Sequence, residues 1–316
     1  MGGGSVLSVV VIGRDEGESL AACLRSAQDA LTRMPHELIY VDSGSRDDSL
    51  AVARAAGARC FRLRTDAPTA GLGRRVGARE ARGAFLLFLD GDMRLEPGFA
   101  ETALAVLEAE GLDGAVGIRH DVYERGGAAV DENPNYYRCE RRREAREFGG
   151  AILLRAATLA RAGGWAADVS SCEEAELHAR LLKCGARIAE LPTPMIRHID
   201  RVRDNRGLLG AIFSPRRLGL GQALRHALRV GSAPMFLLRE RTAFLFWLID
   251  ALCIAALCAA GARAWGVVAL AQALQWSAFA LSGRARGFAG QKLLFFYLPA
   301  GMLHFRVRDQ DYDAWT

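Results

Sequence analysis

FLLFLDGDMRLEPG, residues 85–98, joins a run of large apolar residues to two carboxylates that lie two positions apart, Asp90 and Asp92. A strand that is apolar without alternation is buried on both faces, as in a parallel sheet covered by helices. Ligands of such sheets bind beyond the carboxyl ends of the strands. The stretch therefore predicts a buried strand that delivers two acidic side chains to a binding edge.

The surrounding chain alternates strand-like and helix-like segments. Strands are predicted at 6–12, 37–42, 59–64 and 84–90, and helices at about 18–31, 49–57 and 73–83. This order predicts an α/β fold with a doubly wound sheet over residues 1–200. Because Asp42 ends the second strand and Asp90 ends the fourth, we expect both side chains along the same edge.

Composition favours a basic protein that faces a membrane. The 316 residues include 41 Lys and Arg against 36 Asp and Glu, a formal net charge of +5. Arginines cluster at 141–143, 201–206 and 216–241, and the last cluster runs directly into an apolar region. That continuity favours an anionic membrane surface over nucleic acid. Seven scattered cysteines without zinc-type spacing predict reduced thiols in a protein that faces the cytosol, and the N-terminus shows no signal peptide.

Two segments near the C-terminus, 243–262 and 264–282, each approach the ~20 apolar residues that cross a bilayer. With only Arg263 and its neighbours between them, they predict a tight transmembrane helical hairpin. Arginines on both outer flanks place those ends in the cytoplasm. Residues 293–305 contain Pro299 and are too short to span alone, so an interfacial or re-entrant segment is expected. The alternative is a very hydrophobic soluble helical subdomain, which Asp250, Gln272 and Gln275 would favour.

The Asp90-Gly91-Asp92 turn suits a divalent cation. Carboxylate oxygens are hard ligands that bind Mg²⁺ or Mn²⁺, ions that commonly also hold substrate phosphates. Gly91 lets the backbone turn closely around a ligand. A D-x-D sequence alone is more often a solvated turn, but its position after FLLFL strengthens the metal hypothesis.

With its neighbours, this motif resembles the family 2 inverting glycosyltransferases, whose catalytic domain has the GT-A fold. VVVIGRDEGESLAACLRS (9–26) looks like the family's opening strand, loop and helix, with Asp15 where asparagine is more usual. ELIYVDSGSRDDS (37–49) is similar to its second-strand motif, and GRRVGAREARGAFLLFLDGDM (73–93) to the arginine helix that leads into the metal-binding strand. The resemblance covers about residues 5–200.

The resemblance implies a nucleotide-sugar site. It assigns nucleotide contacts to Asp15, Asp42, Ser43, Asp47, Arg74 or Arg75, Asp90 and Gly91, and the metal diphosphate to Asp90 and Asp92. His198 would supply a late metal or phosphate contact, although a surface histidine is an equal alternative.

The segment 148–188 resembles the family's acceptor side, where Gly163-Gly164-Trp165 precedes an acidic pair. The catalytic base maps to Glu174, and because the family usually has Asp there, Glu173, Glu174 and Glu176 all stay open. Trp165 either packs beneath the acceptor site or stacks on a sugar. QALRH (222–226) resembles the Q-x-x-R-W motif of processive relatives but has His226 for the tryptophan, which favours coincidence.

The sequence thus predicts four parts: a GT-A catalytic domain at 1–200, basic amphipathic interfacial helices at 201–241, membrane segments at 242–305 and a C-terminal tail at 306–316. The expected activity is metal-dependent transfer, with inversion, from a UDP-, GDP- or dTDP-linked sugar to a lipid-linked or envelope-polysaccharide acceptor. The expected location is the inner cell membrane, with the catalytic domain facing the cytoplasm and no nucleic acid bound. The alternatives are a sugar-phosphate nucleotidyltransferase, disfavoured because GRDEGES replaces a Gly-rich basic loop, and a non-catalytic membrane scaffold.

Overall fold

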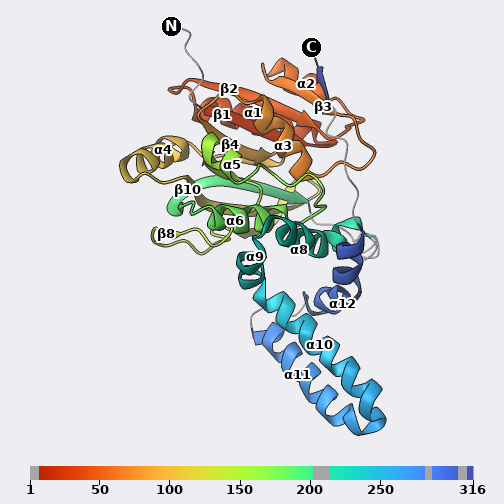
Figure 1. The fold of residues 1–316 in the computed structure, drawn as a ribbon. Coiled ribbons are helices and arrows are strands. Elements are labelled where there is room, and N and C mark those ends of the chain that lie inside the picture. The colour runs from red at the N-terminus through yellow and green to blue at the C-terminus, as the bar shows by residue number, and fades with distance from the viewer. Residues whose placement is uncertain (1–6, 202–213, 282–286, 305–311, 316) are drawn as a thin grey trace.

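The computed structural model describes residues 7–201, 214–281, 287–304 and 312–315, and places a mixed sheet with flanking helices above an elongated helical arm (Figure 1). Four strands form the parallel half of the sheet in the order β3-β2-β1-β4. They are β1 (Leu7–Gly13), β2 (His36–Asp42), β3 (Arg59–Leu63) and β4 (Phe85–Asp90). In register, Ile12 of β1 lies beside Asp90, and Gly13 lies beside Asp42. The two acidic strand ends therefore share one edge, as the apolar runs predict.

Helices α1 (Gly17–Ala30), α2 (Ser49–Ala55) and α3 (Ala70–Glu80) cover this half of the sheet. Helix α3 begins and ends earlier than the sequence predicts, because the Thr69 side chain accepts a hydrogen bond from the Leu72 N–H and caps it. The helix also lies close to β1, since a Cβ at Gly77 would stand 2.2 Å from Val10 Cγ1. This early start places Arg74 inside the helix, pointing to the strand ends.

The second half makes the sheet mixed rather than purely parallel. Strand β9 (Ile152–Arg155) is antiparallel to β4, and β6 (Gly114–Arg125) is parallel to β10 (Ile188–Arg201). The full path is β11-β3-β2-β1-β4-β9-β6-β10-β5, with β7 paired to β6 and β8 to β10. The remaining elements are β5 (Met93–Leu95), α4 (Phe99–Glu110), β7 (Ala128–Asn133), β8 (Arg143–Glu144), α5 (Ala156–Arg161) and α6 (Glu173–Lys183).

Amphipathic helix α8 (Gly219–Val230) follows the short helix η1 (Pro215–Leu218) and uses its apolar face inside the protein. Ala223, Leu224 and Ala227 are buried in a second core cluster, together with Val169 and Phe236. The leucine–arginine pattern of 204–240 predicts helices lying on a membrane surface, but the apolar side of α8 packs against α6 and α12 instead. Residues 202–213, including most of the 201–206 arginine cluster, lie outside the described residues.

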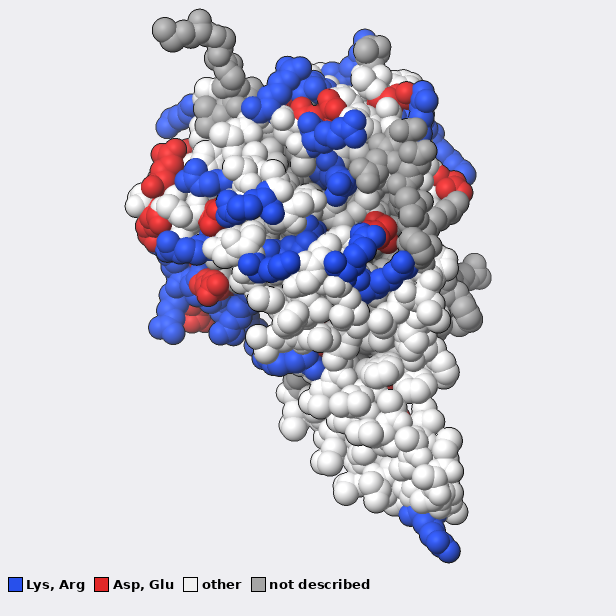
Figure 2. All heavy atoms as spheres, in the orientation of Figure 1, with Lys and Arg blue, Asp and Glu red and all other residues white. Residues whose placement is uncertain are grey.

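The arm consists of two apolar helices, which follow the short helix α9 (Ala233–Arg239). They are α10 (Arg241–Ala260) and α11 (Trp265–Leu281), joined by η2 (Gly261–Ala264). They run side by side in opposite directions, since Phe246 packs on Phe279 while Asp250 accepts hydrogen bonds from Gln272 and Gln275. Their outer faces are strongly apolar and exposed, and Figure 2 shows a projection without charged side chains until its tip. Within the described residues, the segment Arg241–Leu281 is long and apolar enough to cross a membrane.

The last elements return toward the α/β body. Helix α12 (Gly287–Leu303) includes Pro299 and packs closely on α8. Strand β11 (Tyr312–Trp315) then pairs antiparallel with β3 and adds an edge strand to the sheet. The sequence predicts only a C-terminal tail there, because four residues carry too little pattern to identify a strand.

Candidate active site

Arg74 draws together acidic side chains from two distant segments. Its guanidinium donates to Asp90 Oδ1 at 2.7 Å and to Glu173 Oε1 at 3.0 Å, with Glu174 Oε1 at 3.4 Å. Arg74 is 1% exposed and lies over the Trp165 ring, with its Cζ 4.9 Å from the ring centroid. Trp165 is itself fully buried, so it packs beneath this cluster. The end of β4 and the start of α6 therefore meet around one arginine.

Glu174 has the properties of a proton acceptor near neutral pH. Burial raises the pKa of its carboxyl to about 7, with a further increase from the adjacent Glu173 charge and an opposing effect of Arg74. Both glutamates pair with Arg74, but Glu173 is closer, at 3.0 Å against 3.4 Å, and keeps 7% exposure where Glu174 keeps 22%. A carboxylate that is accessible and has a raised pKa suits general base chemistry better than one held in a buried ion pair.

Glu176 faces away from this cluster. Its fully buried carboxylate accepts two hydrogen bonds of 2.6 Å from Arg180 and lies 2.7 Å from His226 Nδ1. Although burial alone would raise its pKa, the hydrogen bonds from His226 and Arg180 lower it overall. Among the three candidate bases, Glu176 is therefore a structural ion-pair residue.

Four carboxylates gather around the turn that follows β4. Burial raises the pKa of Glu16 to about 8, and the neighbouring Asp92, Asp90 and Asp47 raise it further. Within the described part of the chain, Glu16 Oε2 and Asp92 Oδ1 are buried without a hydrogen-bond partner. A Cβ at Gly91 would stand 2.2 Å from Glu16 Oε2, so the end of the Glu16 side chain lies directly against this glycine. The mutual repulsion of these carboxylates and their unpartnered oxygens fit a site that binds a cation.

The residues fit a hard divalent ion, although they do not form a complete cage. Among the described residues, no group of three His, Cys, Asp or Glu side chains is arranged to hold a metal. Mg²⁺ commonly takes one or two carboxylates and completes its shell with water and substrate phosphates. Asp92 and the nearby Asp90 therefore supply the one or two carboxylates that a phosphate-bound ion takes from the protein.

His198 lies at the other side of Asp92. Its Nε2 is 3.3 Å from Asp92 Oδ2, and its Nδ1 is 3.1 Å from Asp121 Oδ1. Although burial alone would lower its pKa, the hydrogen bonds to Asp121 and Asp92 raise it to about 9. The ring lies between two carboxylates, with the Arg119 guanidinium also 3.0 Å from Nδ1, and a metal contact of His198 stays a prediction.

Two loops beside α1 form the rim of a cavity of about 470 Å³. Asp47 Oδ2 accepts the Gly17 N–H at 3.0 Å, and Asp15 Oδ1 accepts the Arg46 N–H at 2.7 Å. Asp15 stands in a left-handed conformation with φ 55°. The cavity is lined by Arg14, Asp15, Glu16, Gly17, Glu18, Ser19, Asp47, Asp92, Ile199 and Asp200. It brings the first two loops and the metal motif together.

Asp42 does not reach that cavity. It is fully buried, and its carboxylate accepts the N–H groups of Gly44 and Ser45 at 3.1–3.2 Å. In this structure Asp42 shapes the turn after β2. The neighbouring Ser43 is partly exposed and donates its backbone N–H to Gly13 O. A nucleotide contact of Asp42 stays a prediction.

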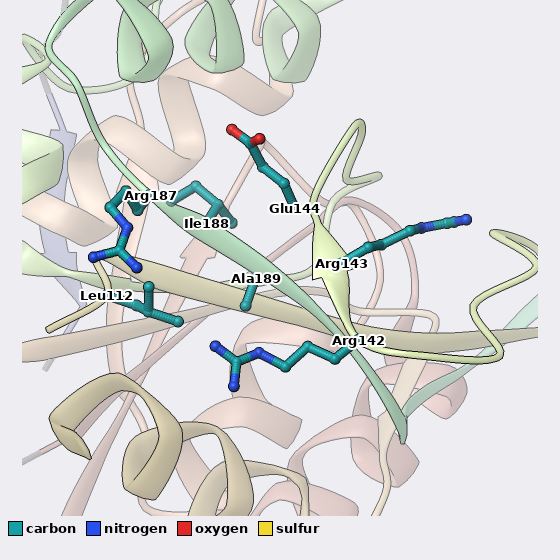
Figure 3. A pocket seen from close by; sticks show the side chains of 7 residues that line it. All are labelled: Leu112, Arg142, Arg143, Glu144, Arg187, Ile188 and Ala189. Atoms are coloured by element: carbon teal, nitrogen blue, oxygen red, sulfur yellow. The ribbon is translucent and has the colours of Figure 1, made fainter. Parts of the chain in front are cut away.

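Other basic residues lie outside the cluster. Arg75 points away from Arg74 and donates to the carbonyls of Gly163 and Trp165. Figure 3 shows a separate pocket of about 390 Å³ toward which the guanidinium groups of Arg142 and Arg187 extend, whereas Arg143 turns outward. Arg143 pairs with the buried Glu190 and Arg142 pairs with Glu110. The arginine run at 141–143 therefore serves local structure.

Sequence reasoning missed three contributors to the site. Glu16 lies in the polar loop before α1. Its position there, just after the end of the first strand, could have marked it as a site residue. Gly150, with φ 76°, lies against Asp90, because a Cβ there would be 2.4 Å from Asp90 Oδ2. Asp121 contacts His198 although the two residues are 77 positions apart in the sequence, so no local pattern predicts this contact.

Comparison with known proteins agrees with this geometry. Residues 8–160 match the family described as Glycosyl transferase family 2. This part of the chain is a glycosyl transferase family 2 domain. The match covers the first two loops, Arg74 and the Asp90–Asp92 turn, and it stops before α6 and the candidate bases.

The glycosyl transferase domain and the helices after it also resemble solved structures. S. aureus TarS 1–349, in complex with UDP-GlcNAc, aligns with a TM-score of 0.58 at 18% identity over 98% of this chain and 96% of that one. GalNAc-T7 with UDP, GalNAc and Mn²⁺ aligns with a TM-score of 0.57 at 14% identity over 70% of this chain and 48% of that one. At these identities the likeness shows the GT-A fold.

A curated relative, a TPR repeat-containing protein of Synechococcus elongatus, is 40% identical over 90 residues. Those residues are 28% of this chain and 21% of the relative, so the chain spans about a fifth of that protein's length.

Proposed function

We propose that the protein transfers a sugar from a nucleoside diphosphate sugar to an acceptor hydroxyl, with inversion at the anomeric carbon. The observation that carries the proposal is the cluster around Arg74, which brings Asp90 of the metal motif next to Glu173 and Glu174. Direct displacement needs a base on one side of the sugar and stabilisation of the departing diphosphate on the other. These two requirements correspond to α6 and to the turn after β4.

In this mechanism each side chain has a distinct task. Glu174 accepts the proton of the acceptor hydroxyl as that oxygen attacks. Arg74 holds Glu173 and Asp90 and so fixes the distance between the base and the donor side. The rim loops with Asp15 and Asp47 hold the nucleotide. A bound Mg²⁺ or Mn²⁺ at Asp92 and Asp90 would neutralise charge on the departing diphosphate.

The same proposal places the protein at a membrane, with α10 and α11 as a transmembrane hairpin. Leu252 and Leu270 are 60% and 61% exposed, which is unfavourable in water but suits lipid. An active site held at headgroup height would reach a lipid-linked or growing envelope acceptor. The solved neighbours bound to UDP sugars make UDP-linked donors the first to test.

The test is a panel of UDP-, GDP- and dTDP-sugars incubated with the full chain in detergent or nanodiscs, with Mn²⁺ or with EDTA. We expect metal-dependent hydrolysis or transfer from one donor class, lost in Asp92→Ala and in Glu174→Gln. Binding of a donor without turnover in any condition would support the scaffold alternative instead. Formation of a nucleotide-sugar from a sugar phosphate would support a nucleotidyltransferase.

A further inference from the structure

Residues 166–172 form a loop that leads directly into the candidate base. It connects Trp165 to α6, whose first residues are Glu173 and Glu174. Cys172, the residue before α6, has φ 64°, a left-handed conformation that is costly for a residue with a Cβ. Such conformations persist where the surroundings determine them. The position of Glu174 therefore depends on what holds this loop.

On one side the loop is held by α3. Thr69 Oγ1 donates to Ala167 O at 2.9 Å, and a Cβ at Gly71 would stand 2.2 Å from Ala166 O. This contact belongs to the same helix that presents Arg74. It sets the first half of the loop relative to the donor side of the site.

On the other side the loop is held by α8, through one buried amide. Gln222 Oε1 accepts both the Ser170 N–H at 2.9 Å and the Ser170 hydroxyl at 2.6 Å, and Gln222 is 6% exposed. Next to it, Ser171 Oγ donates to Arg216 O at 2.6 Å. A Cβ at Gly219 would overlap this same Ser171 Oγ. The second half of the loop is thus held by η1 and by α8, where Gln222 makes two of the contacts.

The amide nitrogen of Gln222 faces the opposite way. Its Nε2 donates to the carbonyl of His304, just after α12, at 3.4 Å. Close packing continues along α8, where a Cβ at Gly221 would stand 2.1 Å from Leu298 O of α12. Helix α12 is in turn tied to α10, because Lys292 donates to Asp250 at 2.6 Å. The side chain of Gln222 therefore lies between the 166–172 loop and helix α12, which is tied to the apolar helix α10.

We propose that Gln222 is a positioning residue that holds the 166–172 loop, and with it Glu174, in register with the seating of α12. This inference rests on the proposed function, in which Glu174 is the base. On this proposal, the Q-x-x-R-H sequence of residues 222–226 has a structural role in this chain. Gln222 and His226 both contact the α6 region, at Ser170 and at Glu176.

The test compares Gln222→Met, which removes all three hydrogen bonds of the amide at similar volume, with Gln222→Glu, which still accepts from Ser170 but no longer donates to His304 O. We expect kcat to fall on the order of 10²-fold in Gln222→Met, the loss that a base displaced by about 1 Å would cause. The donor KM should stay within about twofold, because Asp15, Asp47 and Asp92 lie on other segments. Gln222→Glu should recover most of the lost kcat. Gln28→Ala, which removes a glutamine contact to Ala56 O at the edge of the α/β body, is the matched control.

A second measurement does not require turnover. Amide hydrogen exchange in peptides covering 167–173 should become at least about tenfold faster in Gln222→Met and stay unchanged in Gln28→Ala. If Gln222→Met does not fold, Ser170→Ala, which removes only the hydroxyl, should show smaller changes of the same kind.

The proposal is overturned if exchange in this loop is unchanged, or if kcat is unchanged in Gln222→Met. It is also overturned if kcat falls only in parallel with a raised donor KM and a lowered unfolding midpoint. If instead Glu174→Gln transfers sugar as fast as the unmodified chain, the proposed function fails, and the exchange result still reports on the loop.

Discussion

Arg74 shows how a single buried charge can organise a site. A guanidinium that is 1% exposed needs anionic partners, because an unpaired buried charge is very costly. Asp90, Glu173 and Glu174 supply those partners and crowd three carboxylates around it. Burial and the adjacent Glu173 raise the pKa of Glu174, so the same packing that stabilises the fold also gives this carboxyl the pKa that the proposed base requires.

Glu174 and Glu176 are expected to separate activity from stability. Glu174→Ala should lower the transfer rate by about 10²–10⁴-fold with a nearly unchanged unfolding midpoint. Glu176→Ala should leave Arg180 buried without its partner and cost about 3–5 kcal/mol of unfolding free energy. Thermal unfolding and single-turnover assays of both variants would check this. Loss of transfer in Glu176→Ala at an unchanged midpoint would move the base to Glu176.

The pH dependence of the two properties should have opposite signs. Because the proton acceptor must be ionised, kcat/KM should rise with pH through a midpoint near 7. The folded-state pKa of Glu174 lies above its unfolded value of 4.5, so the folded protein binds more protons in that window. Its contribution to stability is therefore present below pH 4.5 and is lost as pH rises through about 7. Glu16, raised to about 8, acts in the same direction. A rising limb that persists in the residual activity of Glu174→Gln would assign the titration to another group.

At the scale of elements, polar contacts between apolar helices fix how the arm is assembled. Asp250 of α10 is 6% exposed and is contacted by Gln272 and Gln275 of α11 and by Lys292 of α12. In lipid, such groups are tolerated when they satisfy one another. The polar residues that favoured a soluble subdomain from sequence thus face inward, while the leucines face outward.

The Asp250–Lys292 pair should behave as one unit. Lys292→Met alone leaves a buried carboxylate without its charge partner and should loosen α12, whereas Asp250→Asn combined with Lys292→Met should restore much of the stability. Limited proteolysis after α11 and thermal unfolding in detergent would measure this. Strictly additive effects of the two substitutions would show that the pair does not hold α12.

At the scale of the whole molecule, a charged α/β body continues into an arm whose surface in Figure 2 is free of charge except at its tip. The two parts are not simply joined in series. Helix α12 returns to pack on α8, and β11 pairs with β3 at the edge of the sheet. A truncation after residue 240 would therefore remove supports of the α/β body as well as the arm, and would not isolate the effect of anchoring.

Substitutions on the outer face of the arm give a cleaner test of membrane association. Leu252→Arg with Leu270→Arg should weaken insertion, since an arginine near the middle of a membrane helix costs about 2.5–3.5 kcal/mol on insertion scales. We expect the unmodified chain to stay with membranes after an alkaline wash and the double variant to be depleted. Leu252→Phe with Leu270→Phe is the matched control. Recovery of the unmodified chain in the soluble fraction would reject membrane anchoring.

The sequence by itself determined the parallel half of the sheet, the acidic strand ends and the apolar arm. Each of these follows from local pattern: the four predicted strands are present with their ends shifted by one residue or none, and composition alone marks the two long apolar helices. Local pattern works there because burial on both faces demands a continuous apolar run. The family resemblance then pointed to Asp90 and Asp92 as a metal site and to three neighbouring glutamates as the base.

Only the tertiary structure distinguishes the surroundings of those glutamates, and which of them is the base stays a prediction. Arg74 of α3 pairs with Glu173 and Glu174, whereas Glu176 pairs with Arg180 of its own helix and lies 2.7 Å from His226 of α8. The same holds for Glu16, Gly150 and Asp121, whose importance lies in contacts over long sequence separations. The apolar face of α8 is likewise buried inside the protein, because α6 and α12 pack against it. Periodicity reveals that a face is apolar, but the partner that buries it is fixed by the packing of distant segments.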